Sequence, residues 1–199
     1  MARGGRSPAN RSEPDLIKAA QEGDREAFDS LVEAHYSNVY NTAYRMLGAP
    51  SVASDATQSV FVRVWEALSS FRGDASFSTW LYRITTNVCL DELRRRKSEP
   101  LSLTEDDDEP AREREVPDFS DEPARTAEER DLQRLVHDAI SRLSEDFRVV
   151  VVLYDLRGLS YQEISEVLNV PLGTVKSRLN RARQALRQEI APHMELFEG

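Results

Sequence analysis

Apolar residues recur at intervals of three and four positions along most of the chain, which is the period of a helix with one buried face. In the first half this pattern predicts four helices, at Leu16–Ala20, from Asp24 to Leu47, at Ser51–Leu68 and from Ser78 to Lys97. Gly23 closes the first, and Gly48 and Pro50 end the second, because glycine and proline stop helices. The inward positions of the two central helices are Phe28, Leu31, Val32, Tyr36, Val39, Tyr40, Ala43, Leu47, Ala56, Val60, Phe61, Val64, Trp65 and Leu68.

The pattern stops over residues 99–125, where acidic residues and prolines replace the large apolar side chains. The prolines are Pro100, Pro110, Pro117 and Pro123. Such a segment cannot bury enough surface to offset the entropy of ordering the chain, so the sequence predicts a flexible acidic linker. Residues 1–13 are also poor in large apolar side chains, and we expect a disordered N-terminal arm there.

Helical spacing returns after the linker. Thr126 and Glu129 have the spacing of a capping box, which satisfies free N–H groups at a helix start. The inward residues of this helix are Leu132, Leu135, Val136, Ala139, Ile140 and Leu143. Ser144 caps a further helix that stops at Gly158. Its β-branched run Val149–Val152 suits a strand by propensity, but the cap and the closing glycine favour a helix.

The remaining part of the chain has the pattern of two helices joined by a tight turn. Ser160 and Glu163 form another capping box, and Asn169 and Pro171 break the first helix. The second helix starts near Gly173–Thr174 and carries five basic residues, which are Lys176, Arg178, Arg181, Arg183 and Arg187. This is the pattern of a helix-turn-helix that places its second helix in the major groove of DNA. An ordinary helical hairpin with a solvated basic face is the alternative.

We therefore expect an all-α chain of two small helical domains joined by a flexible acidic linker, with a helix-turn-helix in the C-terminal domain. The expected segments are an arm over 1–13, an N-terminal domain over 14–98, the linker over 99–125, a C-terminal domain over 126–191 and a short tail over 192–199. Each domain is near the lower size limit for a hydrophobic core of its own.

The net charge of −9 belongs to one segment of the chain. Residues 99–125 hold eleven acidic residues and three arginines, and the rest of the chain holds 24 acidic and 23 basic residues. The predicted domains are therefore near neutral, with local basic patches. Because phosphate neutralisation supplies most non-specific DNA binding, we expect strong binding to DNA only when the protein is part of a larger assembly.

Several protein classes are disfavoured by composition. No apolar run approaches the ~20 residues that span a bilayer, and the N-terminal arginines precede no apolar stretch, so we expect neither membrane insertion nor a secretory signal. The single cysteine, Cys89, forms no internal disulfide and fits a reducing cytoplasm. His35, His137 and His193 lack metal-ligand spacing, and no phosphate-binding glycine loop occurs, so we expect no metal, no cofactor and no enzyme activity.

The third predicted helix carries a polar strip beside two aromatic residues. Asp55, Gln58 and Ser59 fall on one side of the helix. Phe61 and Trp65 are spaced i and i+4, so their side chains lie together. A polar strip beside an aromatic anchor suits docking onto a partner helix. The alternative is that the aromatic residues belong to the core and the polar residues are merely solvated.

A second constellation runs from Phe71 to Arg96 and combines a glycine-containing loop with aromatic and basic residues. These residues are Phe77, Trp80, Tyr82, Arg72, Arg83 and the run Arg94–Lys97. Single-stranded nucleic acid is bound by such a combination, because bases stack on aromatic rings and phosphates attract the cations. The alternative is a set of core aromatic residues with a basic helix end that the helix dipole favours.

Three stretches, in this order, resemble the bacterial extracytoplasmic-function (ECF) sigma factors, which are group IV of the sigma-70 family. DATQSVFVRVW resembles the core-polymerase-binding helix of that family, FRGDASFSTWLYRI its promoter-melting segment, and VPLGTVKSRLNRAR its reader of the upstream promoter element. The resemblance covers roughly residues 14–98 and 126–190. It implies an alternative sigma factor that binds core RNA polymerase and directs promoter-specific transcription initiation in the cytoplasm.

The resemblance also implies contacts for the N-terminal domain. The docking residues on the clamp coiled coil of the largest polymerase subunit would be Asp55, Gln58, Ser59, Phe61 and Trp65. Many relatives have glutamate where this chain has serine at position 59. The loop and the fourth helix would hold a flipped base of the minus-ten element and support duplex melting, through Arg72, Asp74, Ser76, Phe77, Trp80, Arg94, Arg95 and Arg96.

For the C-terminal domain the resemblance implies reading of the minus-thirty-five element. Lys176, Ser177 and Arg181 would face base edges, and the residues at phosphates would be Thr174, Arg178 and Arg183. The polymerase flap would be a further contact, and an anti-sigma factor is an expected partner. The acidic linker would pass through the RNA exit region of the polymerase, or serve only as a solubilising tether.

The main alternative function is a stand-alone helix-turn-helix transcriptional regulator. The C-terminal helix pair alone fits that function. The strip over Asp55–Trp65 and the constellation over Phe71–Arg96 argue against it, because a stand-alone regulator has no use for either. The near-neutral charge of the predicted domains argues in the same direction.

Overall fold

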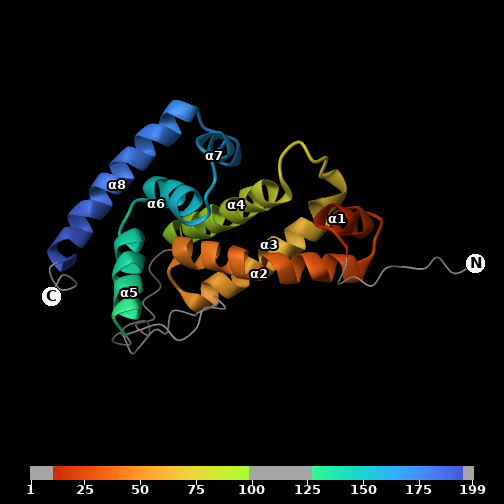
Figure 1. The fold of residues 1–199 in the computed structure, drawn as a ribbon, viewed down its shortest axis with the longest axis horizontal. Helices are drawn as coiled ribbons and strands as arrows, with labels where there is room; N and C mark the ends of the chain where they lie inside the picture. The colour runs from red at the N-terminus through yellow and green to blue at the C-terminus, as the bar shows by residue number, and fades with distance from the viewer. Residues whose placement is uncertain (1–10, 99–126, 195–199) are drawn as a thin grey trace, which may run out of the picture.

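The computed structural model describes residues 11–98 and 127–194, and every regular element within those ranges is helical (Figure 1). The N-terminal unit comprises α1 Glu13–Gln21, α2 Arg25–Leu47, α3 Pro50–Ala67, the 3₁₀ helix η2 Leu68–Ser70 and α4 Phe77–Ser98. The C-terminal unit comprises α5 Ala127–Ser141, α6 Glu145–Val151, the π-helical turn η3 Val152–Leu156, α7 Tyr161–Leu168 and α8 Leu172–Met194. The predicted all-α class is confirmed.

Local signals set the ends of the N-terminal helices. The Asp24 carboxylate accepts a hydrogen bond from the Ala27 N–H and caps α2, as predicted. Gly48 ends α2 with a φ of 80°, a left-handed conformation that glycine adopts without strain. Pro50, predicted as part of the helix break, is instead the first residue of α3, because the first N–H of a helix has no helical partner to lose. α1 begins at Glu13, inside the segment expected to be the arm.

The core of the N-terminal unit lies where α2, α3 and α4 meet. Val39 and Ala43 of α2 and Val60 of α3 are fully buried, and Leu81 of α4 joins them. Burying a valine or leucine side chain contributes about 1.5–3 kcal/mol, so the predicted inward positions Val39 and Val60, together with Leu81, stabilise the unit. Thr85 is also buried, and its hydroxyl donates a hydrogen bond of 2.9 Å to the Leu81 carbonyl of the same helix.

The C-terminal unit confirms a helix over the β-branched run. Val150 and Val152 are fully buried, where a helix satisfies every backbone group locally. Ser144 occupies the N-cap position of α6, but its side chain makes no capping hydrogen bond. Its carbonyl accepts the first helical hydrogen bond, from the Arg148 N–H over 2.8 Å, so the predicted cap is confirmed in position but lacks the side-chain hydrogen bond. Thr126, the linker over 99–125 and residues 1–10 and 195–199 lie outside the described residues.

The helix-turn-helix has the predicted local geometry. Ser160 and Glu163 form the capping box of α7 in both directions. Asn169 ends that helix in the left-handed region with a φ of 52°. α8 starts at Leu172, slightly earlier than predicted, and continues through Pro192 to Met194. It therefore includes the first residues of the predicted tail, because a proline so near the helix end removes one hydrogen bond without stopping the last turn.

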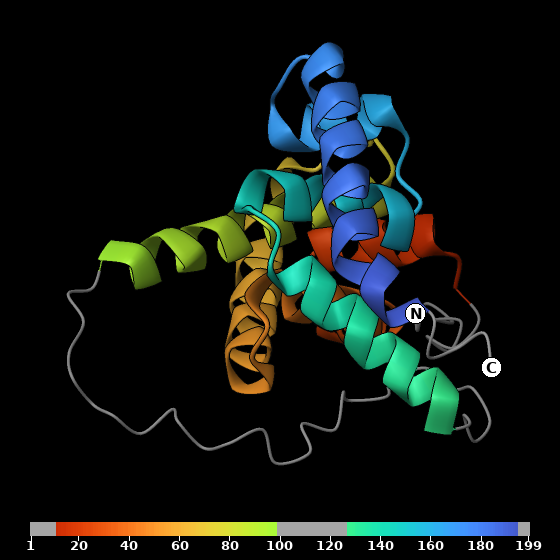
Figure 2. The ribbon, with the colours of Figure 1, turned by 90° about the vertical axis from the view of Figure 1, so that its left-hand side faces the viewer.

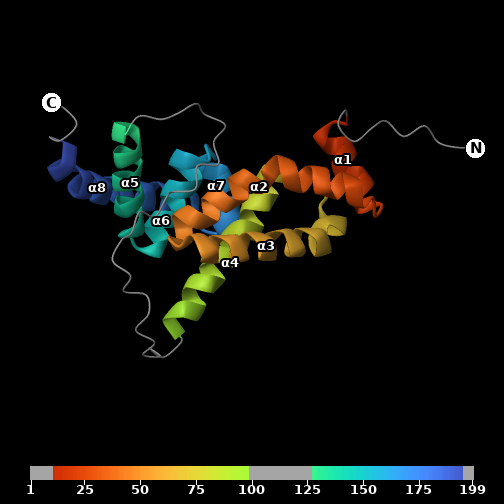
Figure 3. The same ribbon diagram turned by 90° about the horizontal axis from the view of Figure 1, so that it is seen from below.

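The two units pack against each other, which the sequence left open. α4 packs on α7, and α2 packs on α5, α6 and η3 (Figures 1 and 2). The buried side chains form one continuous cluster that runs through both units. α3 lies on the side of the N-terminal unit that faces away from α7 and α8 (Figure 3). Because the two units share this core, neither depends only on the small hydrophobic core that it could form alone.

Candidate nucleic-acid and partner interfaces

The predicted docking strip lies on the outer surface of α3. The side chains of Asp55, Gln58 and Ser59 are exposed. The Ser59 hydroxyl donates to the Asp55 carbonyl over 2.9 Å, so its proton is satisfied within the helix. Because α3 is not covered by the C-terminal unit, this strip is open to a partner (Figure 3).

The two aromatic residues of the strip lie partly in the packed interior and partly at the surface, so they fit both the exposed anchor and the core residue that the sequence left as alternatives. Trp65 remains 40% exposed while its ring meets Phe28 edge-on, with centroids 4.8 Å apart. Phe61 is half-buried and stacks on Tyr36 with centroids 6.2 Å apart. Both rings rest on α2 and keep part of their surface in solvent, as an anchor for a partner requires. Val62, 57% exposed, adds apolar surface that a lone valine in a sequence does not reveal.

A surface cavity of about 300 Å³ opens between α3 and α4 beside this strip. Its walls carry charges of both signs, from Asp55, Arg63, Asp91, Glu92, Arg95 and Arg96. Arg63 Nη1 lies 3.5 Å from Asp91 Oδ2 and links the two helices. The sequence could not indicate this cavity, because the residues that form it are far apart in the chain.

The predicted loop connects η2 to α4 (Figure 1). Arg72 and Asp74 are exposed, and Gly73 between them has a φ of 79°, which favours glycine. Ser76 caps α4, because its hydroxyl accepts a hydrogen bond of 3.0 Å from the Thr79 N–H. The loop therefore presents one cation and one carboxylate at a fixed helix start.

An aromatic cluster supports this loop from within. Phe77 is only 4% exposed, and its ring centroid lies 5.6 Å from that of Phe71 and 5.7 Å from that of Trp80. His35 of α2 packs on the same ring at 5.2 Å. Phe77, predicted beside a flipped base, thus sits beneath the surface, while Phe71 and Trp80 are half-buried and keep surface available for stacking.

The basic run at the end of α4 is paired within its own helix. The ion pairs are Arg94–Asp91 at 3.1 Å, Arg95–Glu92 at 2.9 Å and Arg96–Glu92 at 3.1 Å. The hydrogen bond from Arg95, followed by that from Arg96, lowers the pKa of Glu92 against the opposing effect of burial. Three predicted phosphate ligands therefore already hold carboxylate partners, which reduces the positive field at this helix end.

The predicted reading residues of α8 differ in exposure. Lys176, Ser177 and Arg181 are exposed. Arg181 makes no ion pair with any residue in the ranges that the structure describes. Thr174 is half-buried, and its carbonyl accepts a 3.0 Å hydrogen bond from the Ser177 hydroxyl. The side chain of Arg181 is thus available to meet a base edge.

Two other arginines of α8 are held by acidic residues of the same unit. Arg178 Nη2 lies 2.9 Å from Asp146 Oδ2 at the start of α6. Arg183 pairs with Asp155 of η3, and this hydrogen bond raises the pKa of Arg183. The orientation of both arginine side chains is therefore fixed by contacts that exist only in the folded unit.

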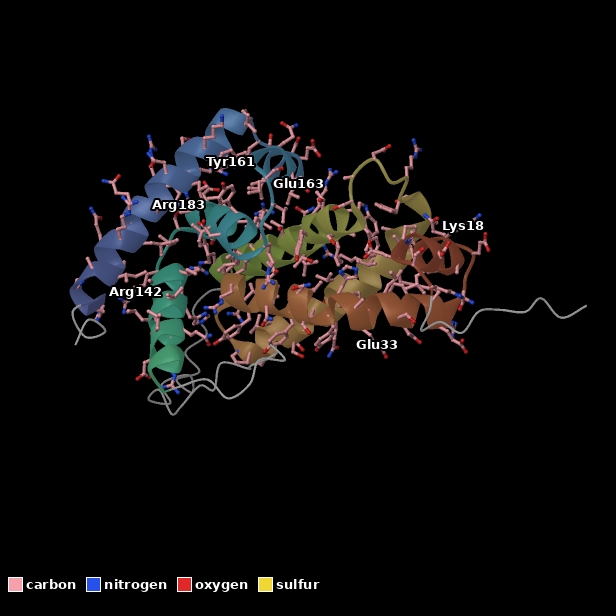
Figure 4. All side chains as sticks on the ribbon, viewed as in Figure 1. Lys18, Glu33, Arg142, Tyr161, Glu163 and Arg183 are labelled. Carbon is pink, nitrogen blue, oxygen red and sulfur yellow. The ribbon has the colours of Figure 1, made fainter. Side chains whose placement is uncertain are left out.

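Two stacked tyrosines complete this arrangement, and one of them, Tyr161, is labelled with Arg183 in Figure 4. The rings of Tyr154 and Tyr161 lie 4.8 Å apart and nearly parallel. The Arg183 guanidinium carbon is 5.1 Å from the Tyr154 ring, and Lys176 Nζ is 5.8 Å from the Tyr161 ring. A cation over each outer face of an aromatic pair is stabilising, so the tyrosines position two basic residues that the sequence placed near DNA.

Metal-ligand clusters and membrane-spanning helices are both absent from residues 11–98 and 127–194. No group of three or more histidine, cysteine or acidic side chains in those ranges is arranged to hold a metal ion. None of the helices in them is both long and apolar enough to cross a membrane. Cys89 is fully buried, and burial raises the pKa of its thiol to about 12, which keeps the sulfur protonated and unreactive.

Comparison with known proteins places these elements in one family. Residues 31–99 match the family model of sigma-70 region 2, and residues 133–186 match that of sigma-70 region 4. The ECF RNA polymerase sigma factor SigW of Bacillus subtilis is 35% identical over 87% of this chain and 94% of its own. The ECF RNA polymerase sigma-E factor of Escherichia coli K12 is 34% identical over 89% of this chain and 93% of its own.

A solved structure extends the likeness to the fold of both units. The structure of CnrH in complex with the cytosolic domain of CnrY matches 89% of this chain and 96% of its own, with a TM-score of 0.64 and 26% identity. The chain therefore belongs to the ECF family of RNA polymerase sigma factors. It is an alternative sigma factor that directs promoter-specific transcription.

Proposed function

We propose that this sigma factor acts in the cytoplasm, has no catalytic activity of its own, and joins core RNA polymerase to promoter DNA. The observation that carries the proposal is the presence of two kinds of surface on one chain. One is the exposed polar and aromatic strip of α3, and the other comprises the loop before α4 and the basic helix α8. A stand-alone DNA regulator needs only α8.

In this proposal residues 14–98 form the region 2 domain and residues 126–191, with the continuation of α8, form the region 4 domain. The α3 strip docks on the clamp coiled coil of the largest polymerase subunit, and region 4 contacts the flap. Trp65 supplies the apolar anchor, because it is both exposed and braced by Phe28. Asp55 and Gln58 supply polar contacts that fix the register of the partner helix.

The loop before α4 is proposed to hold a flipped base of the minus-ten element. Arg72 and Asp74 are exposed there, and Ser76 keeps them in register by capping α4. Trp80 offers a half-buried ring for stacking, with Phe77 supporting it from below. The arginine run at 94–96 binds phosphates of the opened duplex by exchanging its carboxylate partners for the DNA backbone.

The helix α8 is proposed to read the minus-thirty-five element in the major groove. Lys176, Ser177 and Arg181 face base edges, in keeping with their exposure. Thr174, Arg178 and Arg183 contact phosphates and set the position of the helix on DNA. A bidentate arginine contact with guanine discriminates by about 1–3 kcal/mol, so Arg181 carries the largest share of base recognition.

An anti-sigma factor is proposed as a regulatory partner. CnrH, which this chain resembles over both units, was solved in complex with the cytosolic domain of CnrY. The exposed apolar residues Val62 and Trp65 on α3 are the surface that such a partner would cover, because they are otherwise left in water.

Reconstitution with purified bacterial core polymerase tests the proposal. The variant carrying Asp55→Ala with Gln58→Ala removes two exposed side chains and leaves the core of the unit untouched. We expect its affinity for core polymerase to fall by about tenfold or more, as for other interface anchors. The matched control is Gln184→Ala with Gln188→Ala, an exposed polar pair on α8.

Binding and promoter-dependent transcript are measured separately. A specific transcript from the wild-type complex supports the proposal as a whole. An unchanged affinity of the α3 variant would contradict the docking strip. A folded wild-type protein that binds DNA but never core polymerase would favour the stand-alone regulator.

A further inference from the structure

One glutamine side chain joins the end of α1 to the loop that connects η2 to α4. The amide nitrogen of Gln21, the last residue of α1, donates to the Leu68 carbonyl over 3.0 Å and to the Phe71 carbonyl over 2.8 Å. A glutamine amide carries two N–H groups, so it can serve both carbonyls at once. Leu68 begins η2 and Phe71 follows it, and Gln21 therefore holds the backbone at both ends of that turn.

The helix α1 is a fixed support for this side chain. Leu16, Ile17 and Ala20 are buried, and α1 packs on α2 and η2 (Figure 1). A short helix is held in place by such a buried face, because the face cannot leave the core without exposing apolar surface to water. Gln21 directly follows Ala20, so its side chain extends from backbone that is anchored in the core.

Phe71 is the residue at which the chain leaves η2 and enters the loop. Its backbone is extended, with a φ of −69° and a ψ of 117°. Its N–H donates to the Leu68 carbonyl over 3.0 Å, so that oxygen accepts from both Phe71 and Gln21. Its ring lies beside that of Trp80, with centroids 5.1 Å apart. A shift of the Phe71 backbone would therefore move both the loop and the aromatic surface next to Trp80.

The other end of the loop is connected to α1 through α2. Glu13 is the first residue of α1, and its Oε1 lies 2.8 Å from Nε2 of His35, whose side chain is only 12% exposed. The His35 ring meets that of Phe77 edge-on, with centroids 5.2 Å apart. Phe77 is the first residue of α4, where the loop ends. The two ends of α1 are thus connected to the two ends of the loop.

We propose that Gln21 is a positioning residue for recognition of the minus-ten element. Gln21 itself contacts no DNA. It fixes the Phe71 backbone, so that the loop presents Arg72 and Asp74 in the geometry that receives a flipped base. A loop that is already ordered loses less conformational entropy when the base enters, and it therefore binds the base more tightly. This consequence for recognition rests on the proposed function of the loop.

The chemistry of this contact requires a side chain with two donors. Both partners of Gln21 are carbonyl oxygens, which only accept hydrogen bonds. A glutamate of the same size would place a carboxylate against two carbonyl oxygens, and a methionine of similar length would supply no N–H. Because the Gln21 side chain is exposed, its hydrogen bonds compete with water. Removing them should therefore loosen the loop without unfolding the unit.

Amide hydrogen exchange on the full-length, unbound protein measures the order of the loop. We expect Gln21→Met to speed exchange of the Phe71 N–H by about threefold to tenfold, because the turn loses two hydrogen bonds. Gln21→Glu should speed this exchange further, because its carboxylate repels the two carbonyl oxygens. Gln188→Met makes the same change at an exposed glutamine of α8 and is the matched control. Unchanged exchange at Phe71 in both Gln21 variants would overturn the proposal.

Binding of single-stranded DNA to the complex with core polymerase measures the consequence for recognition. The probes are the non-template strand of the minus-ten element of a recognised promoter, and copies in which one nucleotide at a time lacks its base. In wild type, removal of the flipped base should weaken binding by about tenfold. Gln21→Met should bind the intact strand about fivefold more weakly and the abasic strand as wild type does, so that discrimination falls to about twofold.

The ratio between intact and abasic strands separates positioning from a purely structural role, because a destabilised protein would lose affinity for both strands in proportion. Equal discrimination by wild type and Gln21→Met, despite faster exchange at Phe71 in the variant, would overturn the role of Gln21 in recognition. A wild-type complex that discriminates at no nucleotide would overturn the proposed function of the loop instead. The exchange measurement on the unbound chain would then decide by itself whether Gln21 fixes the loop.

Discussion

The basic ends of α4 and α8 differ in where their acidic partners come from. In α4 the arginines pair with Asp91 and Glu92, three or four residues earlier in the same helix. In α8 two arginines pair with Asp146 and Asp155, which lie 32 and 28 residues earlier on other elements. Pairs within a helix screen its charge wherever the helix moves. Ion pairs between elements instead fix the direction of single arginine side chains. Arg181 has no such pair within the described residues, so its side chain is available to a ligand.

The largest expected effect comes from Arg181, which makes no ion pair with any residue in the described ranges. Arg181→Ala should weaken binding of the polymerase complex to its promoter by about tenfold to a hundredfold, because it removes a base contact of about 1–3 kcal/mol. Gel-shift titration with a promoter recovered by transcription of genomic fragments measures this.

The control for Arg181 is Arg142→Ala, which breaks an exposed pair between Arg142, just after α5, and Glu189 of α8 and touches no reading residue. Affinity for core polymerase should be unchanged in both variants. Equal losses of promoter and polymerase binding would remove the distinction between reading and docking residues.

A smaller effect tests whether the tertiary pairs position their arginines. Asp155→Asn should weaken promoter binding by about threefold, because Arg183 loses the partner that holds it over Tyr154. The loss should be uniform across DNA sequences, as expected for a phosphate contact. Fluorescence anisotropy with several DNA duplexes measures this. A gain in affinity would mean that Asp155 merely screens the charge of Arg183.

For the ion pairs within α4 we expect the opposite result, which is a gain in affinity for DNA when the acidic partner is removed. Glu92→Gln removes the shared partner of Arg95 and Arg96, so affinity for single-stranded DNA should rise about twofold to threefold at low salt. The gain should disappear near 0.5 M salt, where charges are screened over a few ångströms. Glu66→Gln, an equally conservative change at an exposed position of α3, is the control. A loss of affinity would show that Glu92 positions these arginines as Asp155 does.

The smallest expected effect concerns stability at acid pH. The pKa of Glu92 is lowered in the folded protein from its ordinary value of 4.5, so its ion pairs stabilise the fold above that value and are lost as the pH falls through the lowered pKa. Thermal unfolding of wild type and Glu92→Gln should therefore differ by at most about 1 kcal/mol at pH 7, and the difference should shrink as the pH falls below 4.5. A difference that grows as the pH falls below 4.5 would contradict this role for Glu92.

Much of the local structure could be predicted, because its causes are local. Asp24 and Gly48 mark helix ends through contacts with their own neighbours, and Ser160 with Glu163 forms the expected capping box. Ser144 shows the limit of this reasoning, since a residue with the right identity in the right place makes no side-chain cap. The ion pairs in α4 could also be predicted, because the spacing of their residues along one helix brings them together.

The candidate sites were predictable in their composition and not in their geometry. The exposure of Asp55 and Gln58 followed from the helical period. The burial of Phe77 and the stacking of Tyr154 on Tyr161 did not, because each depends on rings from other elements.

The sequence by itself determined the helical class, the two units and the family, since periodicity, caps and motifs act over a few residues. Only the tertiary structure decided that α4 lies on α7, that Thr79 meets Glu163 and that Arg157 reaches Asn38. The physical reason is that such contacts join residues more than eighty positions apart, and their stability depends on the whole buried surface between the units rather than on any local pattern.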